Sequence, residues 1–108
     1  VTKDKVHIDW EQEPSVIDAL IRGMYPSPGT YTYFHGKRIK IHAAFYENSD
    51  TAAIPKGTVV SLKDGNIGVA ATHGIIYLTM VQPENHKRMK TIDFINGYQV
   101  KTNDCFEY

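Results

Sequence analysis

The spacing of hydrophobic positions along the chain changes from helical to alternating between residues 13 and 44. Apolar side chains first recur every three or four residues, as on one face of an α-helix: Val16, Ile17, Leu20, Ile21 and Met24. Glu13-Pro14-Ser15 precedes them, and proline suits a first helical turn because its missing N–H would have no partner there. The pattern predicts a helix that begins here and ends near Gly23 to Tyr25, before Pro26 and Pro28.

Beyond Gly29 the apolar residues alternate, which predicts strands. Thr30 to Tyr33 is rich in strand formers. After a turn at His35-Gly36, the segment from Lys37 to Ala44 has two distinct faces. One face carries Ile39, Ile41 and Ala43, and the other carries Arg38, Lys40 and His42.

The second half of the chain predicts more short strands joined by glycine turns. We expect strands at Gly57 to Leu62, Ile67 to Ala71 and Ile75 to Val81. Two polar segments, Tyr46 to Pro55 and Gln82 to Lys90, are interpreted as loops. A short C-terminal helix should begin at Thr91, which is also its expected N-cap, and end at Gly97.

Together these elements predict a mainly β fold with one N-terminal α-helix and one short C-terminal helix. Short antiparallel strands of this kind close or half-close into a small barrel, which hides their edges. At the N-terminus, Val6, Ile8 and Trp10 alternate with polar residues, so residues 1–9 are interpreted as a linker or docking arm.

Length and charge restrict the possible functions. The chain has 108 residues, enough for a single domain, 1–108, with one core. Its 12 basic and 12 acidic residues cancel, so any nucleic-acid binding must come from a local patch. No apolar run approaches the roughly 20 residues that span a membrane, and we expect no membrane partner. The chain does not begin with Met, and we interpret it as a piece of a longer protein or a processed product.

No catalytic or metal-binding constellation is expected. The five histidines have no helical i, i+4 pair and no cysteine pair beside them. Cys105 lies next to Asp104 in a polar tail, which does not activate a thiol. We therefore predict no catalytic residue, no cofactor-binding residue and no metal ligand in this chain.

Basic side chains are the best candidates for a binding role. They form two groups, one on a predicted strand face and one in the later loop: Arg38, Lys40 and His42, then Lys87, Arg88 and Lys90. Tyr31 and Tyr33 lie on the neighbouring predicted strand. Cations beside aromatic rings suit an RNA backbone and exposed bases. The plainer alternative is a solvated strand face and a solvated loop.

Many short motifs, in one order across nearly the whole chain, resemble the C-terminal domain of methionyl-tRNA formyltransferases. The first half carries Trp10, Pro14, Ile17-Asp18, Ile21-Arg22, Pro26, Pro28-Gly29, Tyr31-Thr32-Tyr33, Gly36 to Ile41 and Ala44. The second half carries Pro55 to Val60, Gly74-Ile75, Val81-Gln82-Pro83, Lys87-Arg88-Met89, Asp93-Phe94, Asn96-Gly97, Asp104 and Phe106. No single motif is specific, but their common order is.

The resemblance implies an open, OB-fold-like β-barrel without catalytic activity of its own. In that family an N-terminal domain, absent from this chain, transfers the formyl group of 10-formyltetrahydrofolate to methionyl-tRNA. The resemblance therefore implies two partners, the initiator methionyl-tRNA and the N-terminal catalytic domain, and a cytoplasmic location. 10-Formyltetrahydrofolate would be a substrate of the parent enzyme, with no cofactor in this domain.

Two alternatives stay open at this point. The parent could be a sugar-nucleotide formyltransferase, in which a related barrel packs against other parts or dimerises. The domain could also be a purely structural module that covers a surface of the catalytic domain.

Overall fold

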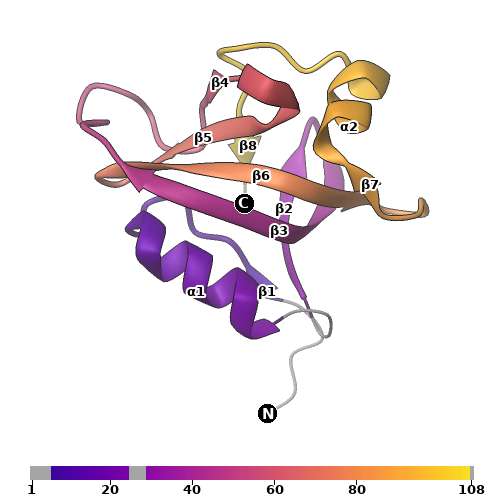
Figure 1. Ribbon diagram of the computed structural model, residues 1–108, viewed down its shortest axis with the longest axis horizontal. Coiled ribbons are helices and arrows are strands. Elements are labelled where there is room, and N and C mark those ends of the chain that lie inside the picture. The colour runs from indigo at the N-terminus through magenta and orange to yellow at the C-terminus, as the bar shows by residue number, and fades with distance from the viewer. Residues whose placement is uncertain (1–5, 25–28, 108) are drawn as a thin grey trace.

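The described residues begin and end with short strands that both pair with the same strand of a β-hairpin. The structure, a computed structural model, describes residues 6–24 and 29–107 (Figure 1). In chain order its elements are β1 (Val6–His7), α1 (Pro14–Met24), β2 (Thr30–Phe34), β3 (Lys37–Asn48), β4 (Val59–Ser61), a 3-10 turn η1 (Lys63–Gly65), β5 (Ile67–Ala71), β6 (Gly74–Pro83), β7 (Met89–Lys90), α2 (Thr91–Tyr98) and β8 (Phe106–Glu107).

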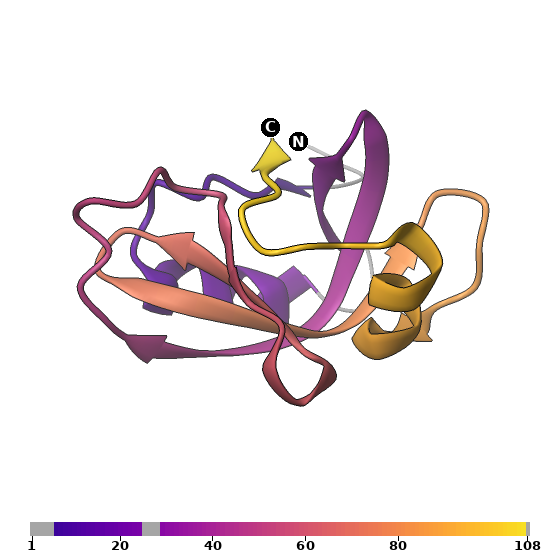
Figure 2. The same cartoon turned by 90° about the horizontal axis from the view of Figure 1, so that it is seen from above.

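The strands form one curled sheet. Their order is β1-β2-β3-β6-β5-β4, with β7 paired to β6 and β8 paired to β2. The β1–β2 pair is parallel, and the other strand pairs are antiparallel. Figure 2 shows the β2–β3 hairpin rising steeply from the part of the sheet that β5 and β6 form. The result is an open half-barrel, which confirms the predicted mainly β, OB-fold-like fold with an N-terminal and a C-terminal helix.

The core lies inside the curl of this sheet and is covered by α1. Figure 1 shows α1 on the opposite side of β3 and β6 from β4, β5 and α2. Ile17 and Ile21 of α1 are 1% exposed. Ile8, from the predicted arm, and Trp10, which directly follows the arm, are 0% and 2% exposed and belong to the same cluster. The arm thus contributes a side chain to the core.

The face of β3 that points to the core changes near Ala43. Ile39 and Ile41 are buried, whereas Ala43 is exposed and Ala44 packs against the core. The pairing of β3 with β6 shifts register on both sides of Ala43. Such irregularities bend a strand and redirect its side chains. Lys40 before the shift and Phe45 after it therefore both lie on the outer face.

A buried hydrogen-bond chain fixes β8 to the barrel. The Trp10 indole N–H donates to Thr32 Oγ1 (3.1 Å), and the Thr32 hydroxyl donates to the carbonyl of Glu107 (2.7 Å). Gly57 lets its segment approach β8 closely, because a Cβ there would lie 2.6 Å from the carbonyl oxygen of Phe106. Its φ of +94° also lies in the region that side chains disfavour.

Several predicted strand boundaries were wrong. The predicted loop from Tyr46 to Pro55 begins too early, since β3 continues to Asn48 by pairing with Ile76, Ile75 and Gly74. The predicted loop from Gln82 to Lys90 contains the end of β6 and all of β7. The strand expected from Gly57 to Leu62 is shorter, Val59–Ser61.

The predicted ends of the helices also needed correction. α1 begins at Pro14, as expected. For α2, the extended N-cap is Lys90 rather than Thr91, and Thr91 is the first helical residue. The helix continues through Gly97 to Tyr98 and ends at Gln99, which adopts the left-handed conformation with φ 54°. The turn expected at Pro26 and Pro28 lies outside the described residues.

Candidate nucleic-acid interface

A row of polar and aromatic side chains crosses four neighbouring strands. The pairing places His7 of β1 opposite Tyr31 of β2, Tyr31 opposite Lys40 of β3, and Lys40 opposite Gln82 of β6. Directly paired residues in a sheet point to the same face. The row therefore forms a continuous strip on the outside of the barrel.

Aromatic rings occupy one end of this strip. His7 stacks on Tyr31 with ring centroids 4.8 Å apart and an interplanar angle of 16°. Tyr33 meets both rings edge-on, at 5.5 Å from His7 and 5.7 Å from Tyr31. The Arg38 guanidinium carbon lies 5.5 Å from the centre of the Tyr31 ring, within the range of a cation–π contact. The sheet thus holds a cation directly beside an aromatic stack.

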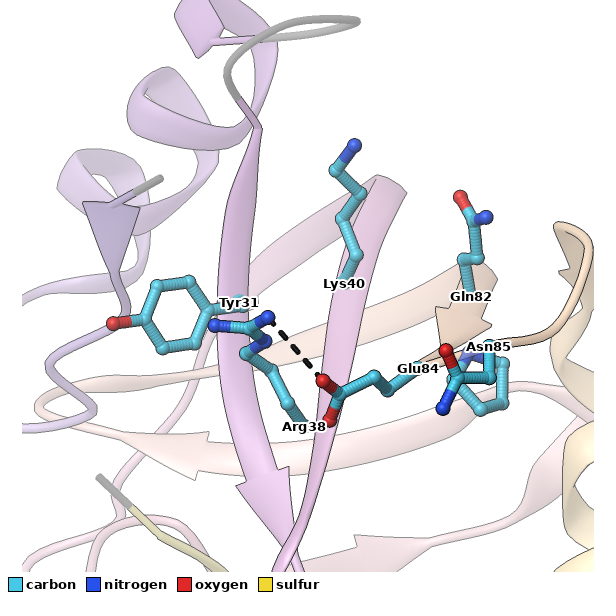
Figure 3. A pocket seen from close by; sticks show the side chains of 7 residues that line it. Tyr31, Arg38, Lys40, Gln82, Glu84 and Asn85 are labelled. Atoms are coloured by element: carbon cyan, nitrogen blue, oxygen red, sulfur yellow. Dashed lines mark hydrogen bonds and ion pairs between the residues drawn. The ribbon is translucent and has the colours of Figure 1, made fainter. Parts of the chain in front are cut away.

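A small hollow opens beside this cation. It has a volume of about 130 Å³ and is lined by Tyr31, Arg38, Lys40, Gln82, Pro83, Glu84 and Asn85. Figure 3 shows the Arg38 guanidinium between the Tyr31 ring and the Glu84 carboxylate. Arg38 Nη2 lies 3.4 Å from Glu84 Oε2, and the two side chains are 34% and 53% exposed. Solvent therefore reaches this ion pair.

Lys40 reaches the hollow by lying over Gly29. A Cβ at Gly29 would come within 2.5 Å of Lys40 Cε, and Gly29 has a φ of +92°. Glycine is suited to both conditions, the close approach and the positive φ. In Figure 3 the Lys40 and Gln82 side chains extend in the same direction, away from the Arg38–Glu84 pair. Lys40 therefore presents its charge separately from that of Arg38.

His42 extends the strip along β3, and its surroundings favour the neutral form of its ring. Its Nε2 lies 2.8 Å from Gln82 Oε1, while Gln82 Nε2 donates to the carbonyl of His86 at 2.8 Å. Because that second bond turns the amide oxygen toward His42, Nε2 is assigned as the donor. Burial lowers the pKa of His42, and the charges of Lys40 and Arg88 lower it further, against the opposing hydrogen bond to Gln82.

The structure brings some of the predicted basic residues together and separates others. Arg38 and Lys40 line the hollow, and His42 follows along the strand. Arg88 lies close enough to affect the charge of His42. Lys87 is exposed in the segment between β6 and β7. Lys90 instead lines another hollow, which shares no residue with the first.

Three residues of this surface were not expected from the sequence: His7, Gln82 and Glu84. His7 belongs to the predicted arm, and the other two to the predicted loop. Each reaches the site through pairing between segments far apart in the chain, and the Glu84 backbone N–H donates to the carbonyl of Arg38 at 2.9 Å. A local hydrophobic pattern carries no signal for such contacts.

The described part of the chain contains neither a metal cluster nor a membrane-spanning helix. Among residues 6–24 and 29–107, no three histidine, cysteine or acidic side chains come together as a metal site would require. Neither described helix is long and apolar enough to cross a membrane.

Comparison with known proteins points to formyltransferases in every case given below. The family described as formyl transferase, C-terminal domain, matches residues 1–99. A methionyl-tRNA formyltransferase of Bdellovibrio bacteriovorus is 35% identical over 106 residues, which is 96% of this chain and 33% of the relative. One from Dictyoglomus turgidum is 38% identical over 109 residues, covering 99% of this chain and 35% of the relative.

A further methionyl-tRNA formyltransferase, from Syntrophus aciditrophicus, is 41% identical over 95 residues, or 88% of this chain and 30% of the relative. The chain spans about a third of the length of these curated relatives. The match to the family extends from β1 through α2, and so includes every strand that lines the basic hollow. The chain therefore belongs to the formyl transferase C-terminal domain family.

Proposed function

We propose that this chain is the noncatalytic, tRNA-assisting part of a methionyl-tRNA formyltransferase. In this proposal the outer face of β2, β3 and β6 binds initiator methionyl-tRNA. A catalytic N-terminal domain, to which this chain would be joined, transfers the formyl group from 10-formyltetrahydrofolate. The proposed location is the cytoplasm, where translation starts.

One observation carries the RNA-binding part of the proposal, namely the aromatic–cation strip around Tyr31. The stack of His7 on Tyr31 lies beside two separately directed cations, Arg38 and Lys40. Phosphates are attracted by the cations, and unpaired bases or ribose rings pack on the aromatic surface. The names of the relatives support tRNA as the nucleic acid involved.

The zero net charge of the chain limits the strength of this binding. A neutral domain gains no general attraction to RNA, so affinity must come from the few cations of the strip. We therefore expect weak binding at physiological salt, with this domain adding to contacts made by the rest of the enzyme. Joining two weak sites in one chain raises the overall affinity without any new contact.

The proposal is tested by titrating initiator tRNA with this chain at several salt concentrations. Log affinity should fall linearly with log salt, because each phosphate contact releases counterions. The double variant Arg38→Gln with Lys40→Gln should bind more weakly and reduce that slope by about 1.4–1.8, at roughly 0.7–0.9 per lost contact.

The matched control removes two cations away from the strip, Lys63→Gln with Lys101→Gln. Both lysines are exposed, and neither lines the hollow. The control should keep both the affinity and the slope. Equal losses in the two double variants would mean that overall charge, rather than the strip, determines binding. No binding by the unmodified chain at low salt would contradict the proposal and favour a packing module.

A further inference from the structure

We propose that the hollow beside Arg38 takes one unpaired base of the bound RNA, and that Glu84 makes it select guanine. This inference rests on the proposed RNA-binding function and adds a base preference to it. It starts from the carboxylate of Glu84, which lines the hollow beside the cations that would attract phosphates.

Glu84 is held at this position by its backbone. Its N–H donates to the carbonyl of Arg38 at 2.9 Å, so β6 continues to pair with β3 one residue beyond its end. Its side chain, 53% exposed, points to Arg38 (Figure 3). The ion pair distance of 3.4 Å exceeds the 2.7–2.9 Å of a strong charge-assisted bond. The carboxylate can therefore turn toward a ligand at small energetic cost.

The size of the hollow suits part of a larger ligand. Its volume of about 130 Å³ is below the roughly 300–1,000 Å³ of sites for whole small molecules. Unpaired RNA bases are commonly bound on aromatic rings or on arginine guanidinium planes, with their edges read by hydrogen bonds. Arg38, held over Tyr31, supplies such a plane within the hollow.

The groups around the hollow determine which base edge fits best. An ionised carboxylate only accepts hydrogen bonds, and it does so through two oxygens. The Watson–Crick edge of guanine offers two adjacent donors, N1–H and the N2 amino group, which match those oxygens. Cytosine and adenine offer one amino group beside a ring acceptor. Uracil offers one N–H between two carbonyl groups, and the carboxylate repels the oxygens of those carbonyls.

The other polar side chains are compatible with this selection. Gln82 is engaged with His42 and the His86 carbonyl, so its amide is not the principal reader. Lys40 points away from the Arg38–Glu84 pair, which leaves it available to the phosphate of the same nucleotide. Asn85 adds a neutral amide to the lining, on the far side of Glu84 from Arg38 in Figure 3.

The test compares four RNA trinucleotides, UGU, UAU, UCU and UUU, by amide chemical-shift titration of this chain. UGU should bind at least about fivefold more tightly than UUU, since a bidentate base contact is worth roughly 1–3 kcal/mol of discrimination. Glu84→Gln keeps the shape of the side chain but loses an acceptor and the charge. It should reduce the UGU preference to less than twofold while binding of UUU stays equal or increases.

Glu47→Gln is the matched control, because it removes the same charge from the far end of β3 and should keep the preference. Initiator tRNA binding, measured in parallel, separates this inference from the proposed function. Binding of tRNA with no base preference, or with a preference that persists in Glu84→Gln, overturns the guanine site alone. Selective binding of UGU without any binding of tRNA would overturn the tRNA proposal and leave the guanine site standing.

Discussion

Arg38 illustrates how single residues prepare this surface for a ligand. Its guanidinium is positioned by Tyr31 beneath it and by Glu84 at its end. Each contact is weak, because an exposed cation–π pair contributes about 0.5–1 kcal/mol and an exposed ion pair about 0–1 kcal/mol. Together they orient the side chain, and because both are weak, Arg38 can still exchange these partners for a ligand. The alternation of residues in β3 predicted Arg38 and Lys40 on one face, but the sequence contains no local sign of Glu84, which lies 46 residues away.

His42 should make stability depend on pH. Its pKa in the folded chain lies below the ordinary value of 6.5, mainly because of burial. The unfolded chain therefore binds the proton more readily, so stability falls as pH drops through 6.5 toward the folded pKa. His42→Gln should reduce this loss, measured by urea denaturation at pH 7.5 and 5.5. An NMR titration of the unmodified chain gives the direct check.

Gln82→Ala provides the companion test for His42. The hydrogen bond from His42 to Gln82 raises the pKa, so its removal should lower the pKa further. A His42 that titrates at or above 6.5 in the unmodified chain would contradict this account.

Thr32 should contribute more to stability than its neighbour Thr30. Thr32 accepts the indole N–H of buried Trp10 and donates to the carbonyl of Glu107. Thr32→Val leaves that indole N–H without a partner, at a cost of about 1–3 kcal/mol. Thr30 is equally buried but makes one long bond, 3.3 Å to the carbonyl of Ile41. Thr30→Val should therefore cost clearly less in the same denaturation experiment, and equal costs would argue against the Trp10–Thr32 network.

At the scale of elements, local signals predicted the existence of strands better than their ends. β5 was predicted with its observed bounds, because Gly65 and His73-Gly74 delimit an apolar run. β3 was predicted too short, since its last residues are exposed and are held only by pairing with β6. β8 has two residues and no pattern of its own. The start of α2 at Thr91 was predicted correctly, but its N-cap was not, because the sequence favours Thr91 as a cap while the extended residue before the helix is Lys90.

Gly57 lies close to Phe106 of β8, and its replacement should destabilise the fold. In Gly57→Ala the new Cβ would lie 2.6 Å from the Phe106 carbonyl oxygen, at a φ of +94°. Backbone strain of this kind costs about 1–3 kcal/mol. Gly97→Ala is the matched control, since nothing lies within 4 Å of the added atom and the residue is helical. It should stabilise by up to about 1 kcal/mol. Thermal unfolding of both variants checks the prediction, and a neutral Gly57→Ala would contradict it.

At the scale of the whole molecule, the half-barrel separates a core-forming inside from an outer face that is accessible in this chain. The order of motifs predicted this family and its open barrel, and the match over residues 1–99 bears that out. It could not predict which distant residues complete the outer face, namely His7, Gln82 and Glu84. That face is assembled from β1, β2, β3 and the β6–β7 connection, and only the folded chain brings these segments together.

We propose above that RNA binds to the outer face of β2, β3 and β6. The most direct measurement is amide chemical-shift mapping of this chain on addition of initiator tRNA at low salt. The account predicts perturbations concentrated at Tyr31, Arg38, Lys40 and the Gln82 to Asn85 segment, with α1 largely unaffected. Perturbations confined to α1 or to the β4–β5 side of the barrel would contradict it.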